Sequence, residues 1–321
     1  MMNALDSLIR SRTDLLQRGW TERRIAEAVQ AGTLVALRRG WYMDAADRAE
    51  LWPEQRHHAH VIAVDRDARG SAVMSHTSAA VLWGLPLYKV RLARVHMTTP
   101  TPTRISSAPD VFRHVAPLTR GDLALRHGIR CTSLSRTVFD LIRSVPAAAA
   151  VAAADAAERD TGRRQGQWDA DAVLSWRRDL SQRVDEATGA RGIRQARWVA
   201  AFADGRAQLP GESVSRLHLH TLGFAAPDLQ VHVPGPGGRD YFVDFGLDDV
   251  QSFGEFDGKT KYLDEALRSG RTVEEVLLEE KQREDWIRGL TQRRFARWGS
   301  EHIATPEALA ARLASFGITP P

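Results

Sequence analysis

The chain has 321 residues, and its formal net charge at pH 7 is +4. Hydrophobic residues make up 43% and charged residues 26%, which is typical of globular domains and excludes a collagen-like or fully disordered chain. No apolar run approaches the ~20 residues that cross a bilayer, and the start MMNALDSLIRSR has no apolar signal core. The single cysteine, Cys131, cannot form an internal disulfide. We therefore expect a cytoplasmic protein without a membrane partner.

Charge is divided unevenly along the chain. Residues 1–205 carry eight more basic than acidic side chains, and residues 206–321 carry four more acidic than basic ones. A basic first part favours contact with nucleic acid phosphates, although an ordinary solvated surface can have the same composition. Most of the basic residues are arginines. The lysines are only Lys89, Lys259, Lys261 and Lys281.

The first fifty residues predict short helices followed by a β-ribbon. Helices are expected over residues 3–10 and 12–17, and Thr21 is a suitable N-cap for a third helix over residues 22–31. Residues 34–43 predict two strands joined by a turn near Arg39. This order is typical of a winged helix-turn-helix domain, whose third helix enters the major groove. The predicted DNA-binding residues are Glu22, Arg23, Arg24, Arg38 and Arg39. A helical domain without DNA contacts is the alternative.

Residues 51–145 predict a central α+β domain, and residues 146–205 predict a helical connector. Within the central domain, we expect a strand that leads into a helix ending at Gly84, further strands over residues 95–99 and 128–133, and a helix over residues 134–142. His76 and the neighbours His57, His58 and His60 suggest a catalytic or metal site. The sequence gives them no partner at metal-ligand spacing, so packing or surface roles are expected.

From residue 206 onward, carboxylates fall into a pattern on predicted strands. A helix is expected over residues 210–220, strands over 229–233, 241–246 and 252–258, a helix over 273–290 and a strand over 294–298. The two-residue period of a strand places Glu255 and Asp257 on one face, with Asp244 on the neighbouring strand. Converging carboxylates repel each other unless a cation is bound, and oxygen ligands fit Mg²⁺ or Mn²⁺. Such an ion can bind a phosphodiester and activate water, and a nearby lysine can hold the water or the phosphate.

This region resembles a known nuclease superfamily. The residues that carry the resemblance are Arg239, Asp244, the run Glu255-Phe256-Asp257-Gly258-Lys259-Thr260-Lys261-Tyr262 and the run Glu280-Lys281-Gln282-Arg283-Glu284-Asp285. Together they resemble the PD-(D/E)xK nucleases, and more narrowly the very-short-patch-repair-like endonuclease domains of the DUF559 group. The resemblance implies a mixed sheet flanked by helices over residues 206–321 and Mg²⁺-dependent or Mn²⁺-dependent hydrolysis of DNA.

The same resemblance implies the roles of individual residues. The metal ligands would be Glu212, Asp244, Glu255 and Asp257. The catalytic residues would be Asp244, Glu255, Asp257, Lys259, Lys261 and Lys281. The simplest form of the family motif has lysine two residues after the acidic strand residue, where this chain has Asp257. An inactive nuclease fold that serves DNA binding or dimerisation is therefore the alternative.

The first part of the chain resembles AbiEi-type antitoxins, which are winged-helix autorepressors of bacterial toxin–antitoxin operons. The resemblance lies in residues 13–42, 75–86, 95–98 and 132–141. We thus expect an α/β chain of α+β domains: a winged helix-turn-helix over 1–50, a central domain over 51–145, a helical connector over 146–205 and a nuclease-like domain over 206–321. The expected function is DNA binding combined with metal-dependent cleavage. The alternative is a regulator or antitoxin with an inactive last domain and with a toxin or a second copy as partner.

Overall fold

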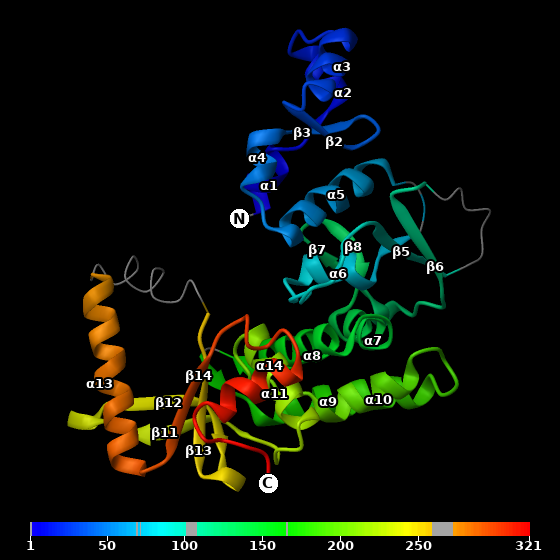
Figure 1. Cartoon of the computed structure of the whole chain (residues 1–321). Helices are drawn as coiled ribbons and strands as arrows, with labels where there is room; N and C mark the ends of the chain where they lie inside the picture. The colour runs from blue at the N-terminus through cyan, green and yellow to red at the C-terminus, as the bar shows by residue number, and fades with distance from the viewer. Residues whose placement is uncertain (1, 69, 71, 101–107, 165, 259–271) are drawn as a thin grey trace. The chain divides into compact units, whose positions relative to one another are not determined.

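A computed structural model describes residues 2–68, 70, 72–100, 108–164, 166–258 and 272–321 (Figure 1). Helices and strands are mixed throughout, which confirms the α+β fold class. The chain forms two compact units. The first comprises Met1–Ala153 with Ser175–Ala201, and the second comprises Ala154–Leu174 with Phe202–Pro321. The residues of the expected connector are thus shared between both units. Among the described residues, none of the helices is both long enough and apolar enough to cross a membrane.

The first unit begins with the predicted short helices and β-ribbon. Ser11 caps the second helix by accepting a hydrogen bond from the backbone N–H of Asp14, and Thr21 caps the third by accepting one from Arg24. Leu15, Ile25 and Leu34 form the buried core of this part. The elements are α1 (Met2–Ser7), β1 (Arg10–Ser11), α2 (Arg12–Gln17), α3 (Glu22–Gln30), β2 (Leu34–Arg38) and β3 (Trp41–Asp44), and the strand order is β1-β3-β2.

The rest of the first unit contains a mixed five-stranded sheet with the order β6-β5-β4-β8-β7. The predicted helix before Gly84 is present, and Gly84 ends it with a left-handed φ of 72°. Met74, Leu82 and Cys131 belong to the core beneath the sheet. The elements are α4 (Ala45–Ala49), α5 (Pro53–Asp67), β4 (Val73–Met74), α6 (His76–Trp83), β5 (Val95–Thr99), β6 (Val111–Val115), η1 (Arg120–Asp122), β7 (Leu123–Arg126), β8 (Ile129–Thr132), α7 (Leu134–Ser144) and α10 (Ile193–Phe202).

Two helices and a small hairpin follow α7 in the chain. Helices α8 (Ala147–Gly162) and α9 (Ala170–Glu186) each contain residues of both units. Strands β9 (Arg163–Arg164) and β10 (Gln167–Trp168) pair as an antiparallel hairpin between them.

The second unit is built on a mixed four-stranded sheet with the order β11-β12-β13-β14. The first three strands are antiparallel, and β14 runs parallel to β13. Helices α11 and α14 contact the sheet at β13 and β14, and α13 contacts it at β14. The elements are α11 (Pro210–Thr221), β11 (Asp228–Pro234), η2 (Pro236–Gly238), β12 (Asp240–Leu247), η3 (Asp248–Val250), β13 (Ser252–Phe256), α13 (Val273–Thr291), β14 (Arg294–Trp298) and α14 (Pro306–Ala314).

A glycine allows the first turn of α11 to lie close to β13. A Cβ atom added to Gly211 would be 2.1 Å from Cζ of Phe256, so only hydrogen fits at this position. The neighbouring residue in α11 is Glu212, which this close packing holds against the sheet. Strand β13 ends at Phe256, two residues earlier than the predicted strand, and α14 was not predicted.

Candidate functional site

The predicted carboxylates of the second unit lie on three different elements. Glu212 is in the first turn of α11, Asp244 is in β12 and Glu255 is in β13. Glu212 and Glu255 are buried, with exposed fractions of 3% and 5%, and Asp244 is half-buried. Buried carboxylates are costly unless other groups offset their charge. The partners of each carboxylate therefore define the chemistry of this site.

Gln230 joins two of these carboxylates. Its amide nitrogen lies 3.2 Å from Oδ1 of Asp244 and 3.4 Å from Oε2 of Glu212. The backbone N–H of Phe256 donates to Oδ2 of Asp244 at 2.9 Å, and that of Gln208 donates to Oε2 of Glu212 at 2.7 Å. Glu212 and Asp244 therefore face one shared donor, which is the arrangement expected of a pair that could bind one cation.

Glu255 is held by two arginines. Its Oε1 lies 2.6 Å from a guanidinium nitrogen of Arg283 on α13, and its Oε2 lies 3.1 Å from one of Arg297 on β14. Burial raises the pKa of Glu255; the two arginines oppose this shift, and the nearby charge of Asp244 adds to it. Both oxygens of Glu255 are thus neutralised by protein cations in this structure.

The remaining predicted residues of this site fall into three groups. Asp257 follows the end of β13, and its Oδ2 lies 3.6 Å from Nη1 of Arg297. Lys281 is exposed on α13. Lys259 and Lys261 lie outside the described residues.

A basic and aromatic pocket opens beside Gln230. Its volume is about 660 Å³, and Gln208 and Gln230 form part of its wall. The amide nitrogen of Gln208 donates to Oε1 of Gln230 at 2.9 Å, so the pocket is connected through hydrogen bonds to the carboxylates. The other side chains that matter here are cationic or aromatic: Arg159, Arg163, Arg206, Trp168 and Phe242. Trp168 and Phe242 are 44% and 51% exposed.

The donor set of the carboxylates fits a hard divalent cation. Glu212 and Asp244 offer carboxylate oxygens, the ligands that Mg²⁺ and Mn²⁺ prefer. Their hydrogen bonds to Gln230 could be exchanged for bonds to an ion. In contrast, Glu255 would have to give up an arginine contact first. In the described part of the chain, three ligating side chains with all ligand atoms within 4.8 Å of one another occur as histidines of the first unit, not as these carboxylates.

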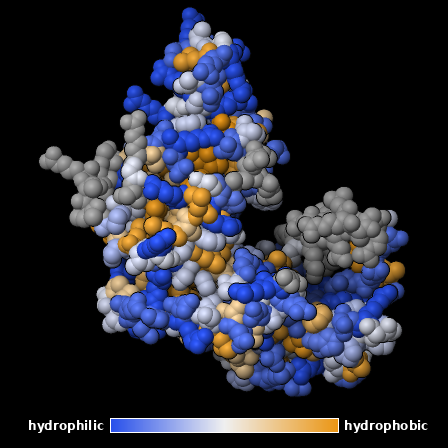
Figure 2. Space-filling view, turned by 180° about the vertical axis from the view of Figure 1, so that it is seen from behind, coloured by the Kyte–Doolittle hydropathy of each residue, from blue (hydrophilic) through white to orange (hydrophobic). Residues whose placement is uncertain are grey.

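The predicted DNA-binding residues lie on α3 and on the β2–β3 ribbon. Glu22, Arg23 and Arg24 are exposed at the start of α3. Glu22 pairs with Arg12 at 2.5 Å, Arg23 pairs with Glu27 at 2.8 Å, and the guanidinium of Arg24 lies 4.2 Å from the ring centre of Trp20. Such exposed pairs are weak and can be exchanged for phosphate contacts. The end of the first unit that carries α2 and α3 has a mainly hydrophilic surface (Figure 2).

The two arginines of the ribbon differ from each other. Arg39 is exposed, whereas the Arg38 side chain is only 17% exposed. Nε of Arg38 lies 3.4 Å from Asp67 and 3.5 Å from Asp110. Arg38 therefore has a structural ion-pair role within the first unit, and Arg39 is the more accessible of the two.

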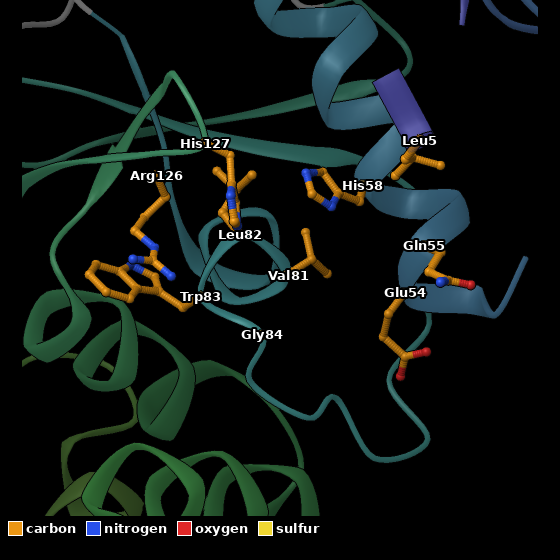
Figure 3. A pocket seen from close by; sticks show the side chains of 10 residues that line it. All are labelled: Leu5, Glu54, Gln55, His58, Val81, Leu82, Trp83, Gly84, Arg126 and His127. Carbon is orange, nitrogen blue, oxygen red and sulfur yellow. The ribbon is translucent and has the colours of Figure 1, made fainter. Parts of the chain in front are cut away.

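A second pocket lies in the first unit, next to α6 (Figure 3). Val81, Leu82 and Leu5 give it an apolar wall, and Arg126 lies on Trp83 with 4.6 Å between the guanidinium carbon and the ring centre. Burial lowers the pKa of His58, which also lines this pocket, to about 4. The apolar wall of this pocket suits an apolar side chain or ligand.

Gln230, Trp168 and Arg297 were not predicted as residues of this site. Gln230 could have been found, because the predicted hairpin of residues 229–233 and 241–246 places it opposite Asp244. Arg297 is the in-register neighbour of Glu255 on the parallel strand β14. A parallel pairing separated by a helix cannot be aligned from the sequence alone. Trp168 comes from a distant segment, and nothing in the sequence signals its approach.

No protein-family model matches the chain. Two curated relatives come from Mycobacterium tuberculosis: the uncharacterized protein MT2308 of strain CDC 1551 / Oshkosh and the uncharacterized protein Rv2248 of strain ATCC 25618 / H37Rv. Each is 28% identical to this chain over 237 residues, which are 74% of this chain and 78% of the relative. The similarity extends over most of both chains, and the names of these relatives state no activity.

Proposed function

We propose that this protein binds DNA through its first unit and hydrolyses phosphodiester bonds in its second unit with Mg²⁺ or Mn²⁺. The observation that supports this proposal most directly is the position of Gln230. On one side its amide joins Glu212 to Asp244, and on the other it lines a pocket of arginines and exposed aromatic rings. A cation site next to a surface that suits a polyanion is the arrangement that phosphodiester hydrolysis needs.

The residues of the site have separable roles in this proposal. Glu212 and Asp244 would hold the ion, which when bound would activate water and offset the charge of the phosphate. Arg163 and Arg206 would bind flanking phosphates, and Trp168 would stack on an unpaired base. Arg283 and Arg297 would keep Glu255 in place. We place both proposed activities in the cytoplasm, where bacterial DNA lies.

A cleavage assay tests the nuclease function. The full chain is incubated with circular plasmid or single-stranded DNA and Mg²⁺ or Mn²⁺, and the products are separated on a gel. We expect Asp244→Ala and Glu212→Gln each to lower the rate by about 10² or more, as for groups that act in the transition state. The matched control is Asp240→Ala, because Asp240 is an exposed carboxylate on the same strand.

Trp168→Ala is expected to raise KM for single-stranded DNA more than it lowers kcat, since stacking on an unpaired base contributes about 1–3 kcal/mol to binding. If the wild type cuts neither substrate and binds no Mn²⁺ in calorimetry, the nuclease proposal is wrong.

A second candidate function is transcriptional regulation by an AbiEi-type antitoxin whose nuclease-like domain does not cut. It is favoured by the arginine contacts on both oxygens of Glu255 and by Asp257 at the lysine position of the motif. DNA would then be bound by α3 and the ribbon alone. A toxin or a second copy of the chain would be the protein partner.

Salt-dependent binding to the DNA upstream of its own gene tests this role. We expect Arg23→Ala and Arg39→Ala each to reduce the slope of log K against log salt by about 1, because each removes one phosphate contact. Arg194→Ala, an exposed arginine on α10, is the control and should leave the slope unchanged. Equal slopes for all three variants would count against DNA binding by α3 and the ribbon.

A further inference from the structure

Three histidines of the first unit come together from three different elements. His76 is the first residue of α6, His96 is in β5 and His114 is in β6. Their ligand nitrogens all lie within 4.8 Å of one another. We call these residues the histidine group. The sequence predicted no metal-binding partner for His76, whose neighbours in space are 20 and 38 positions away in the chain.

The sheet explains why two of these side chains meet. Strands β5 and β6 are parallel, and their register pairs His96 with Phe112 and Thr98 with His114. Alternate residues of a strand share one face, so His96, Thr98 and His114 project from the same side of the sheet. Nδ1 of His96 lies 3.0 Å from Nε2 of His114. Two nitrogens bound to one tetrahedral Zn²⁺ are about 3.3 Å apart, so this pair is already near a ligand spacing.

The third histidine is held by groups that commonly orient metal-binding imidazoles. Nδ1 of His76 lies 3.1 Å from Oγ of Ser75 and 3.9 Å from Oδ2 of the buried Asp140. A carboxylate or hydroxyl on one ring nitrogen fixes the tautomer and leaves the other nitrogen to the metal. His76 also has a φ of 50°, a left-handed conformation that is unfavourable for a residue with a side chain. Strained backbone of this kind is concentrated at functional sites.

We propose that His76, His96 and His114 bind one Zn²⁺ ion, with the hydroxyl of Thr98 next to the remaining coordination position. Three histidines with a fourth, open position are a ligand set that zinc adopts in proteins. The Thr98 hydroxyl is buried and has no hydrogen-bond partner among the described residues, so it can bind a water at that position. Binding requires the rings of His76 and His114 to turn, because they now stack with centres 3.7 Å apart.

The protonation of the histidine group is compatible with metal binding. Burial lowers the pKa of His76 and His114 to about 3 and that of His96 to about 4. All three imidazoles are therefore neutral at pH 7, as metal ligands must be. Nitrogen ligands favour Zn²⁺ over Mg²⁺, so this site is chemically distinct from the carboxylates of the second unit. The proposal does not depend on nuclease activity.

Zinc binding can be measured directly on the full chain. The protein is prepared without a polyhistidine tag, treated with a chelator, dialysed and titrated with Zn²⁺ against a coloured competing chelator. We expect one Zn²⁺ per chain in the wild type and at least 10-fold weaker binding in His96→Gln and His114→Gln. Co²⁺ added in place of Zn²⁺ should give the strong visible absorption of a four-coordinate site, and both variants should lose it.

Two controls separate this site from others. His58→Gln removes another half-buried histidine of the same unit and should leave the affinity unchanged. The double variant Asp244→Ala, Glu255→Ala should also bind Zn²⁺ normally. Thermal unfolding without metal shows whether each variant is folded. Absence of Zn²⁺ binding, unchanged affinity in folded His96→Gln and His114→Gln, or loss of this ion in the double variant would each overturn the proposal.

Discussion

At the scale of single residues, Gln230 combines an unfavourable backbone conformation with a position between the carboxylates of Glu212 and Asp244. Its φ is 54°, in the left-handed region, although it lies in a strand. Such a conformation costs roughly 1–3 kcal/mol for a residue other than glycine. A glutamine persists there although glycine would fit with less strain. The side chain between Glu212 and Asp244 gives a physical reason, because strain at a site is tolerated where the side chain is needed.

This trade-off predicts two effects of one substitution. Gln230→Gly should relieve the backbone strain, but it also removes a donor from the buried Glu212, so we expect it to raise the free energy of unfolding by less than Gln251→Gly does. It should also lower DNA cleavage, because Glu212 and Asp244 lose their shared donor. Gln251→Gly is the matched control: Gln251 has a φ of 47°, is exposed and lies in the turn before β13. It should gain stability with no loss of cleavage. If both variants cut DNA equally well, the proposal that Gln230 belongs to the site would be wrong.

At the scale of elements, the position of α11 against β13 depends on Gly211. A methyl group at this position would be 2.1 Å from Cζ of Phe256, so either the ring or the first turn of the helix must move. We expect Gly211→Ala to lower the free energy of unfolding by about 1–3 kcal/mol, as overpacking in a core does. Cleavage should fall as well, since Glu212 moves with the turn.

The control variant for this prediction is expected to change the free energy of unfolding in the opposite direction. Gly289 lies within α13, and a Cβ atom there meets nothing within 4 Å. Gly289→Ala should therefore stabilise the protein by about 0.5–1 kcal/mol through helix propensity and leave cleavage unchanged. Chemical denaturation of both variants measures the difference. If Gly211→Ala were as stable as the wild type, Phe256 would be able to move aside, and the packing argument would fail.

The elements also show what local sequence can predict. Thr21 and Gly84 mark helix ends by their own hydrogen bonding and backbone freedom, and both were predicted in place. The helix α14 was not predicted, although Thr305 caps it and Pro306 starts it. The contacts of Glu255 with Arg297 and of His76 with His114 join segments far apart in the chain. Such contacts follow from sheet register and tertiary packing, which no local pattern contains.

At the scale of the whole molecule, buried and half-buried histidines of the first unit contribute to the dependence of stability on pH. Burial lowers the pKa of His57 to about 3 and that of His58 to about 4, and the three residues of the histidine group show the same shift. The usual pKa of a histidine side chain is 6.5. Between these values the unfolded chain takes up protons that the folded chain does not. The stability from these residues is therefore complete above about pH 6.5 and is lost as pH falls toward 4.

We accordingly expect the free energy of unfolding to fall between about pH 7 and pH 5, by at most about 1.4 kcal/mol per pH unit for each proton taken up. Burial raises the pKa of Asp65, Asp140, Asp155 and Glu255, which acts in the opposite direction, but these four carboxyls are outnumbered by the five histidines. Denaturant unfolding in the presence of a chelator measures this slope without a metal contribution. His58→Gln should reduce it, whereas His232→Gln, which changes an exposed residue of the second unit, should not. A stability that stays constant or rises over this range would mean that these histidines become charged within the folded protein.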